Sequence, residues 1–292
     1  MAQWKRKRTQ EIETMISETD DEPTQIDRIA EIRGWFRPSR DSIFYSAVQD
    51  YVNGTADLEA TVATITKPID EALTKKPDKD QLDDVWYPII HSAKRIPHNN
   101  VDRHSKLVEL VKALSEHPEP SGTQDDPKYK KLSGLPMAVR EAWNDCPRHD
   151  IGSVPQEVRA YTNFNYFVAR LTDDGLFAAS HVIIWAMREA LENTPESLPW
   201  SYNAHVPAAA MWPIVLGKKL YEREEDLTPK NANEGNPARG GDLWTGGPVL
   251  SKERWAFWKK RFGDVAGQEG IAEETKNIAK EAVETMNKAE SS

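Results

Sequence analysis

The chain has 292 residues, of which 38% are hydrophobic and 29% are charged; this is enough apolar side chain for a folded core and too much for a disordered chain. Acidic residues outnumber basic ones by 47 to 38, and the net charge of −9 disfavours nonspecific binding to nucleic acid or anionic lipid. The single cysteine, Cys146, excludes an intrachain disulfide and suits a reducing compartment. The longest apolar run, Leu176 to Met187, is too short to span a bilayer. We therefore expect a cytoplasmic or nuclear protein without membrane association.

The exception to this acidic character is a basic run from Lys5 to Arg8, beside Trp4. Such a run is found in nuclear-import signals and nucleic-acid patches, and also in solvated chain ends. Because four charges make a short run, we expect a solvated terminus and no nucleic-acid partner.

Helical periodicity with capping signals recurs along the chain, whereas windows of alternating apolar and polar residues are scarce. We predict an all-α fold, namely a single helical-bundle-like domain of about ten helices with a central buried antiparallel hairpin. Residues 1–34 read as a polar helical arm and residues 35–292 as the domain. The Pro-rich loop within residues 117–135 marks a candidate sub-boundary.

In the N-terminal half, the first predicted helices cover residues 9–18, 24–33 and 41–52. Asp57 caps the following helix, Asp78 and Gln81 have the spacing of a capping box for the next, and Asn100 begins another. The Asp57-capped helix carries apolar residues on one face, which are Leu58, Val62 and Ile65.

In the C-terminal half, Ser153 and Gln156 form a capping box with Pro155 in the first turn. A helix over residues 176–193 follows after a short connection and is apolar nearly all round, so these two helices form the predicted central hairpin. Further helices are predicted over residues 208–221, after a cap at Ser251, and over residues 271–286, with a polar tail that should fray. The Gly-rich loop of residues 228–248 is long enough to be functional or disordered, and its Leu-Trp pair should pin its end.

The sequence contains no complete motif for catalysis, metal binding or phosphate binding. Cys146 and His149 have zinc-ligand types but lack a second pair, and the glycine-rich stretch of residues 241–248 lacks the Lys-Ser/Thr of a P-loop. The acidic pair Asp83-Asp84 lacks the third acid that would help to hold magnesium. We therefore predict no metal and no cofactor, and we name no catalytic residue.

Polar residues on apolar helices are the candidate ligand-binding residues. They are Asn163, Tyr166 and Arg170 on the helix after Ser153, His181, Trp185, Arg188 and Glu189 on the next one, and His205 and Trp212 in the following segment. Buried polar groups must be paired, which leaves two interpretations. Either Arg170 or Arg188 meets Glu189, Glu192 or a helix C-terminus in a structural network, or the His and Arg side chains bind an anionic or carbonyl-bearing ligand.

Ten tryptophans is a high count for this length, and most of them lie at helical spacing within apolar stripes, which favours core packing. Arg254 lies beside Trp255 and one turn before Trp258. We interpret this arrangement as cation–π packing on the surface.

Several stretches together resemble a fungal family of helical proteins that is defined only as a domain of unknown function. They are residues 163–171 (Asn-Phe-Asn-Tyr-Phe-Val-Ala-Arg-Leu), 184–192, 208–212, 243–246 and 253–258 (Glu-Arg-Trp-Ala-Phe-Trp). The resemblance covers about residues 40–290. It implies a fungal protein of the cytoplasm or nucleus, and it brings no activity and no catalytic residue.

The leading hypothesis is a non-enzymatic helical binding or scaffold protein with a protein partner, which should expose an apolar patch. The alternative is a small-molecule-binding protein or enzyme with a polar pocket on the central hairpin. The sequence leaves the oligomeric state open.

Overall fold

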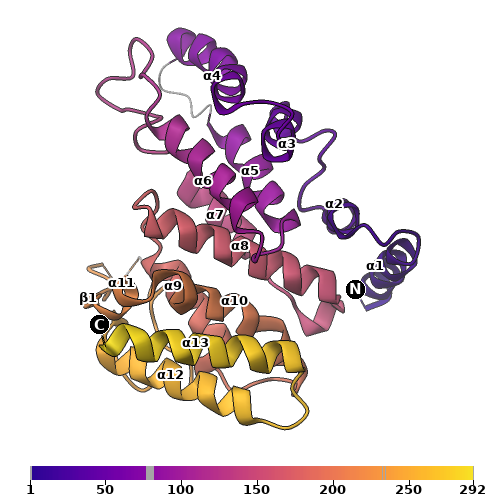
Figure 1. Ribbon diagram of the computed structural model, residues 1–292, viewed down its shortest axis with the longest axis vertical. Helices are drawn as coiled ribbons and strands as arrows, with labels where there is room; N and C mark the ends of the chain where they lie inside the picture. The colour runs from indigo at the N-terminus through magenta and orange to yellow at the C-terminus, as the bar shows by residue number, and fades with distance from the viewer. Residues whose placement is uncertain (1, 77–81, 232, 234, 292) are drawn as a thin grey trace. The chain divides into compact units, whose positions relative to one another are not determined.

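The computed structural model describes residues 2–76, 82–231, 233 and 235–291, with side chains from Lys7 onward (Figure 1). The all-α prediction is confirmed, because the described residues form thirteen α-helices and a single two-stranded sheet. None of these helices is both long and apolar enough to cross a membrane. The predicted capping box of Asp78 and Gln81 lies outside the described residues.

The chain divides into two compact units. Unit 1 comprises Met1–Cys146 and Arg159–Phe167, and unit 2 comprises Pro147–Val158 and Val168–Ser292. Helix α8 (Pro155–Asp173) contributes residues to both units. The predicted packing of α8 against the helix that follows stays a prediction, as does the boundary of the arm at residue 34.

Unit 1 is built from seven helices and part of α8. The seven are α1 (Ala2–Ile16), α2 (Glu22–Arg33), α3 (Tyr45–Asn53), α4 (Leu58–Lys75), α5 (Asp83–Arg95), α6 (Val101–Ser115) and α7 (Leu135–Trp143). Helix α5 packs against α2, α3, α6 and α7, and its Val85, Trp86 and Ala93 have no exposed surface. This helix is the centre of the unit 1 core.

Two capping signals of unit 1 were predicted correctly. The Asp57 side chain accepts from Ala60 N–H at 2.8 Å and begins α4, and the Asn100 side chain accepts from Arg103 N–H at 3.3 Å and begins α6. Gly34 ends α2 with a positive φ of 80°, a conformation that glycine adopts without steric cost.

Helix α4 uses one face for the core and leaves another partly open. Ile65, Ile69 and Leu73 are at most 3% exposed and pack into unit 1. Leu58 and Val62 were predicted to share the core face with Ile65, but both are half-buried.

A cluster of polar side chains ties α2, α3 and α5 together inside unit 1. The Asp27 carboxylate contacts His91 Nε2 and Arg95 Nε, both at 2.8 Å, and accepts a longer hydrogen bond from Tyr45 at 3.4 Å. His91 is only 3% exposed, and this burial lowers the pKa of its imidazole. These contacts satisfy buried polar groups and fix how the three helices meet.

Unit 2 contains the remaining elements of the fold. They are the 3₁₀ turn η1 (His149–Ile151), α9 (Ser180–Met187), the π-helical turn η2 (Arg188–Glu192), α10 (Trp200–Leu216), α11 (Lys218–Tyr221), β1 (Glu225–Asp226), β2 (Val249–Leu250), α12 (Lys252–Gly267) and α13 (Glu273–Ser291). Helix α10 is buried nearly all round and packs against α9 and α13. The antiparallel strands pair Glu225 with Leu250 and so hold the two ends of the 228–248 loop together.

Two helix starts in unit 2 differ from the prediction. Helix α8 is capped at Val154, whose N–H donates to Glu157 Oε2 at 2.7 Å, rather than by the predicted Ser153–Gln156 pair. Helix α9 begins at Ser180 rather than at residue 176, and the Ser180 hydroxyl accepts from Arg223 at 2.5 Å and donates to Glu225 at 2.8 Å. At α8 the carboxylate that completes the first turn, Glu157, is one that the local pattern did not single out.

The last helix is longer than predicted. Helix α13 continues to Ser291 instead of fraying after residue 286. Glu290 accepts from Trp255 Nε1 at 2.9 Å and pairs with Lys259 at 2.5 Å, and both partners lie on α12. Packing against α12 therefore stabilises a final turn that its own polar sequence would leave open.

Candidate functional site

The nine predicted ligand-binding residues fall in both units. Asn163 and Tyr166 lie in unit 1, whereas Arg170, His181, Trp185, Arg188, Glu189, His205 and Trp212 lie in unit 2. Within unit 2, Trp185 stacks on His181 and donates to the same Pro237 carbonyl as Arg188, and His205 lies near Glu189. Arg170 lies on α8, and Trp212 is fully buried in α10.

In unit 1, Asn163 serves the connection between α5 and α6. Its Oδ1 accepts from His98 N–H at 2.8 Å, and its Nδ2 donates to the Lys94 carbonyl at 3.0 Å. That carbonyl belongs to the last turn of α5, where helix geometry provides no partner. Tyr166 packs its ring edge on His104 at 4.9 Å. Asn163 and Tyr166 therefore both make contacts that stabilise unit 1.

In unit 2, Trp185 and Arg188 hold the long loop. Trp185 Nε1 donates to the Pro237 carbonyl at 2.8 Å, and Arg188 donates to the carbonyls of Pro237 at 3.1 Å and Arg239 at 2.9 Å. Burial and the nearby Arg239 charge lower the pKa of Arg188. The hydrogen bonds of Arg188 therefore go to backbone carbonyls of the loop, and Glu189 and Glu192 act on it only through their charges.

The partner of Glu192 is Arg254, which sequence reasoning placed on the surface. Both side chains are fully buried, and Arg254 Nε and Nη2 donate to the two Glu192 carboxylate oxygens at 2.7 and 2.8 Å. Trp258 Nε1 donates to the same carboxylate at 2.6 Å, and Gly241 N–H does so at 3.1 Å. The pair is 62 residues apart in the chain, so no local pattern could have shown it.

The glycine-rich loop is shaped by this buried pair. The third nitrogen of Arg254 donates to the Ala238 and Val249 carbonyls, and the guanidinium lies 5.5 Å from the Trp244 ring. A Cβ on Gly241 would fall 2.5 Å from the Glu192 carbonyl carbon, which is closer than real Cβ contacts come. Gly241 therefore allows the loop backbone to approach Glu192 closely, and the described residues from Pro237 onward form a strap over the Glu192–Arg254 pair.

A second polar pair in unit 2 is less complete. His205 Nε2 lies 3.9 Å from Glu189 Oε1, and the His205 ring packs against the edge of Trp200 at 5.7 Å. His205 is 6% exposed, and its Nδ1 has no hydrogen-bond partner among the described residues. Burial lowers the pKa of His205 to about 4 and raises that of Glu189. Burial therefore keeps the His205 imidazole neutral at pH 7, next to the Glu189 carboxyl group.

The low pKa of His205 predicts a pH dependence of stability. Unfolded histidine takes up a proton near pH 6.5, whereas folded His205 does so only near pH 4, so stability is lost as the pH falls between these values. We expect His205 to account for a loss of about 3 kcal/mol across this window. Glu189 acts in the opposite direction, but it is 45% exposed and its effect is small.

The measurement is urea unfolding of the wild type and of His205→Phe at pH 7 and pH 4.5. His91 has the same sign of effect and is present in both proteins, so the difference between their pH slopes isolates His205. Equal slopes in the two proteins would contradict the assignment.

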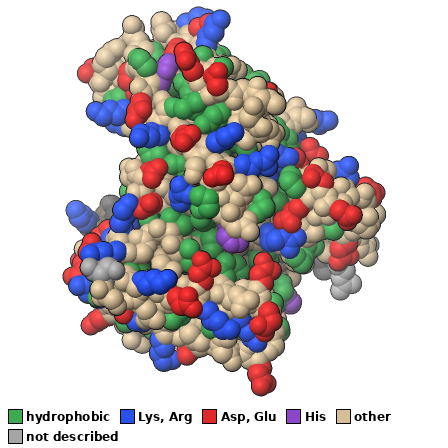
Figure 2. All heavy atoms as spheres, viewed as in Figure 1, with side chains coloured by type: hydrophobic (Ala, Val, Ile, Leu, Met, Phe, Trp, Pro, Cys, Tyr) green, Lys and Arg blue, Asp and Glu red, His purple; other side chains and the backbone are tan. Residues whose placement is uncertain are grey.

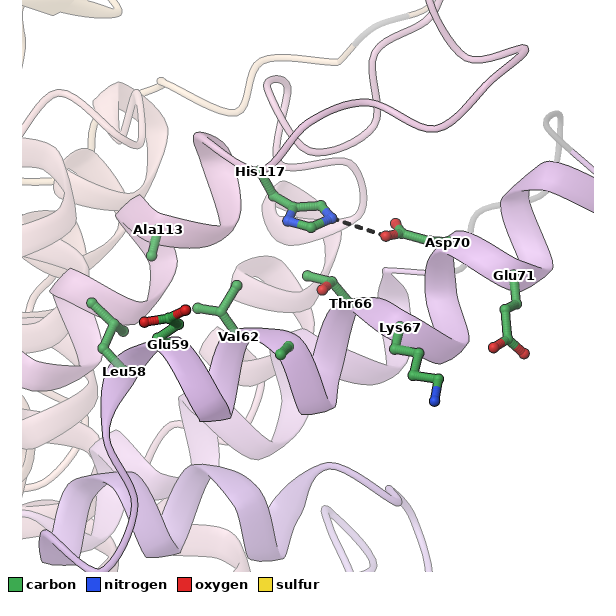
Figure 3. Close-up of a pocket in the computed structure, with 10 residues that line it drawn as sticks. Leu58, Glu59, Val62, Thr66, Lys67, Asp70, Glu71, Ala113 and His117 are labelled. Atoms are coloured by element: carbon green, nitrogen blue, oxygen red, sulfur yellow. Dashed lines mark hydrogen bonds and ion pairs between the residues drawn. The ribbon is translucent and has the colours of Figure 1, made fainter.

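An open, apolar groove lies on unit 1, beside α4 and the end of α6 (Figure 3). Its volume is about 740 Å³, and its surface is mostly apolar. The described lining residues are Leu58, Glu59, Val62, Ala63, Thr66, Lys67, Asp70 and Glu71 of α4, with Ala113 and His117 across from them. Figure 2 shows hydrophobic side chains exposed between charged ones over α4 and α6. We call this feature the α4 groove.

One end of the α4 groove is fixed by a polar cluster. Asp70 accepts a hydrogen bond from Tyr129 at 2.8 Å and contacts His117 Nε2 at 2.9 Å, and the His117 and Tyr129 rings meet edge to face at 4.7 Å. Burial and the Asp70 carboxylate raise the pKa of Tyr129, so its hydroxyl stays protonated as a donor. The cluster holds the loop after α6 against α4 and gives the groove a rigid wall.

The sequence signal for the groove was present but misread. Leu58, Val62 and Ile65 were predicted to lie on one face, whereas only Ile65 is fully buried and Leu58 and Val62 are half-buried beside the groove. Among the described residues we find no group of three or more His, Cys, Asp or Glu side chains that could hold a metal ion.

The chain was compared with protein families, curated proteins and solved structures. Residues 86–262, more than half of the chain, match a family described as a protein of unknown function (DUF3632). Neither the curated proteins nor the solved structures give a match. The matched stretch contains the Glu192–Arg254 pair and the Ala113–His117 side of the α4 groove, but it begins after α4 itself.

Proposed function

We propose that this chain, which belongs to the DUF3632 family, is a protein-binding module whose α4 groove receives a helical segment of a partner protein. The observation that carries the proposal is the half-buried apolar stripe of Leu58 and Val62, which lies on α4 beside a separate, fully buried core stripe. The proposed module does no chemistry of its own. The acidic composition and the single cysteine support a place inside the cell.

The shape of the groove suits a helix. Its lining runs along α4 from Leu58 to Glu71, a rise of about 20 Å or between three and four turns. Ala63 and Ala113 are small, so a partner backbone can approach closely, and Leu58 and Val62 offer apolar contacts at helical spacing. A helix that places leucines at the i, i+4 and i+7 positions would bury this stripe.

Two further observations favour a macromolecular partner over a small ligand. The groove is open along its length rather than enclosed, whereas small-molecule sites are concave and surround most of the ligand. Its polar groups lie mainly at the margins, and two of them, Asp70 and His117, contact each other. An apolar centre with a polar margin is the usual arrangement of a protein interface.

The test uses designed helical peptides of about 16 residues, four turns long, with leucines at the i, i+4, i+7 and i+11 positions. Binding to the full chain is followed by fluorescence anisotropy. We expect Ala63→Gln to weaken binding by about tenfold, because a longer polar side chain fills the groove.

The matched control is Ala60→Gln, the same change on the same helix at an exposed position that does not line the groove. It should leave the affinity within about twofold. Equal effects of the two substitutions, or no binding of any peptide to the wild type, would end the proposal.

A second candidate function is favoured by the unpartnered Nδ1 of buried His205 beside Glu189 in unit 2. It is a small-molecule site in which the imidazole and the carboxyl group bind a polar ligand. In a thermal-shift screen, a metabolite bound there should stabilise the wild type and not His205→Phe. A hit that stabilises both proteins equally would place the ligand elsewhere.

A further inference from the structure

We propose that the helix received by the α4 groove carries basic side chains at both of its ends, about twelve residues apart. This inference rests on the proposed function and adds the chemistry of the partner. It comes from the positions of the charged residues along the groove, which Figure 3 shows in one view.

Carboxylates mark both ends of the groove. Glu59 lies at one end beside Leu58, and Asp70 and Glu71 lie at the other (Figure 3). Glu59 and Glu71 are twelve residues apart on one helix, which corresponds to about 18 Å. Both are exposed, and no hydrogen bond or ion pair is seen for either of them in the described part of the chain.

Asp70 can accept a further donor from the groove. Its two oxygens contact Tyr129 and His117, whereas a carboxylate offers about four acceptor positions. The side chain is 34% exposed, so an approaching ammonium or guanidinium group reaches it without displacing either partner. A basic side chain at this end therefore meets two carboxylates, Asp70 and Glu71.

One basic residue also lines the groove, nearer to its Asp70 end. Lys67 is the basic residue among the described lining residues, and it extends away from Asp70 (Figure 3). Three carboxylates against one ammonium group leave the groove acidic, with the negative charge at its ends. The complementary helix has an apolar stripe, basic ends and an acidic or neutral centre, which favours this partner and disfavours an acidic one.

The experiment compares two labelled peptides with the same leucine stripe, one with a pair of lysines at each end and one with a pair of glutamates. Binding to the full chain is measured by anisotropy at low and at physiological salt. We expect the lysine peptide to bind at least tenfold more tightly, with an advantage that shrinks as salt is added. The double variant Glu59→Gln with Glu71→Gln should reduce the advantage about fivefold, as expected for two exposed ion pairs.

The control is Glu281→Gln with Glu284→Gln on α13 of unit 2, which changes the net charge equally at two exposed helix positions. It should leave the preference unchanged. Circular dichroism checks that α4 stays folded, since Glu59 also lies in its first turn.

Two failures are distinguishable. If both peptides bind equally and both are weakened by Ala63→Gln, the groove docks a helix but the charge inference is wrong. If neither peptide responds to Ala63→Gln, docking at the α4 groove itself is wrong.

Discussion

Replacing Glu192 with glutamine is expected to lower the free energy of unfolding by about 3–5 kcal/mol, the largest effect of any single polar substitution proposed for this chain. The change removes the charge that faces Arg254, whose guanidinium is fully buried and would be left without a counterion. It also weakens the acceptor for Trp258 Nε1 and for Gly241 N–H. Urea unfolding followed by circular dichroism measures the loss.

The control for this prediction is Glu253→Gln, next to Arg254 in the chain but exposed at the start of α12. We expect a change of less than about 0.5 kcal/mol there. The double variant Glu192→Leu with Arg254→Met removes both charges and should recover part of the lost stability, because an apolar pair needs no counterion. A loss at Glu192 no larger than that at Glu253 would show that the pair contributes nothing to stability.

Substituting alanine for Gly241 is expected to cost about 3 kcal/mol and to detach the strap formed by the 228–248 loop. The added Cβ would meet the backbone of Glu192, which cannot move without disturbing the contacts of its own side chain with Arg254. Hydrogen exchange should show faster amide exchange across the loop, including Leu243, whose N–H donates to the Glu192 carbonyl at 2.8 Å.

Gly247→Ala provides a matched control in the same loop. A Cβ at that position has Val249 as its nearest neighbour, at an ordinary contact distance of 3.8 Å. We expect little change in stability or in exchange. Similar losses for the two substitutions would mean that loop flexibility, and not the close approach at Gly241, causes the effect.

The parts of the fold that follow from short-range signals could be predicted. Asp57, Asn100 and Ser251 each cap a helix as expected, since a cap depends on residues two or three positions away. The end of α13 could not, because Glu290 is ordered by Trp255 and Lys259 on another helix. Local pattern predicts where a helix can form, and tertiary contacts decide where it stops.

The candidate sites likewise combine residues that short-range patterns identify with contacts that only the tertiary structure shows. The polar residues on apolar helices were singled out as ligand-binding candidates, but the groups that several of them contact lie far away in the chain. Arg188 meets carbonyls of the loop about fifty residues on. The α4 groove was missed because Val62 and Ile65, three positions apart, were assigned to a single face, and only the packed structure separates the half-buried residue from the buried one.

The central claim, that the α4 groove docks a helix, is tested most directly by hydrogen exchange of the full chain with and without the lysine-ended peptide. The account predicts slower amide exchange in two segments, α4 from Leu58 to Glu71 and the end of α6 from Ala113 to His117. Exchange in the 228–248 loop of unit 2 should stay unchanged. Protection confined to unit 2, or no protection at a peptide concentration that saturates binding, would contradict the claim.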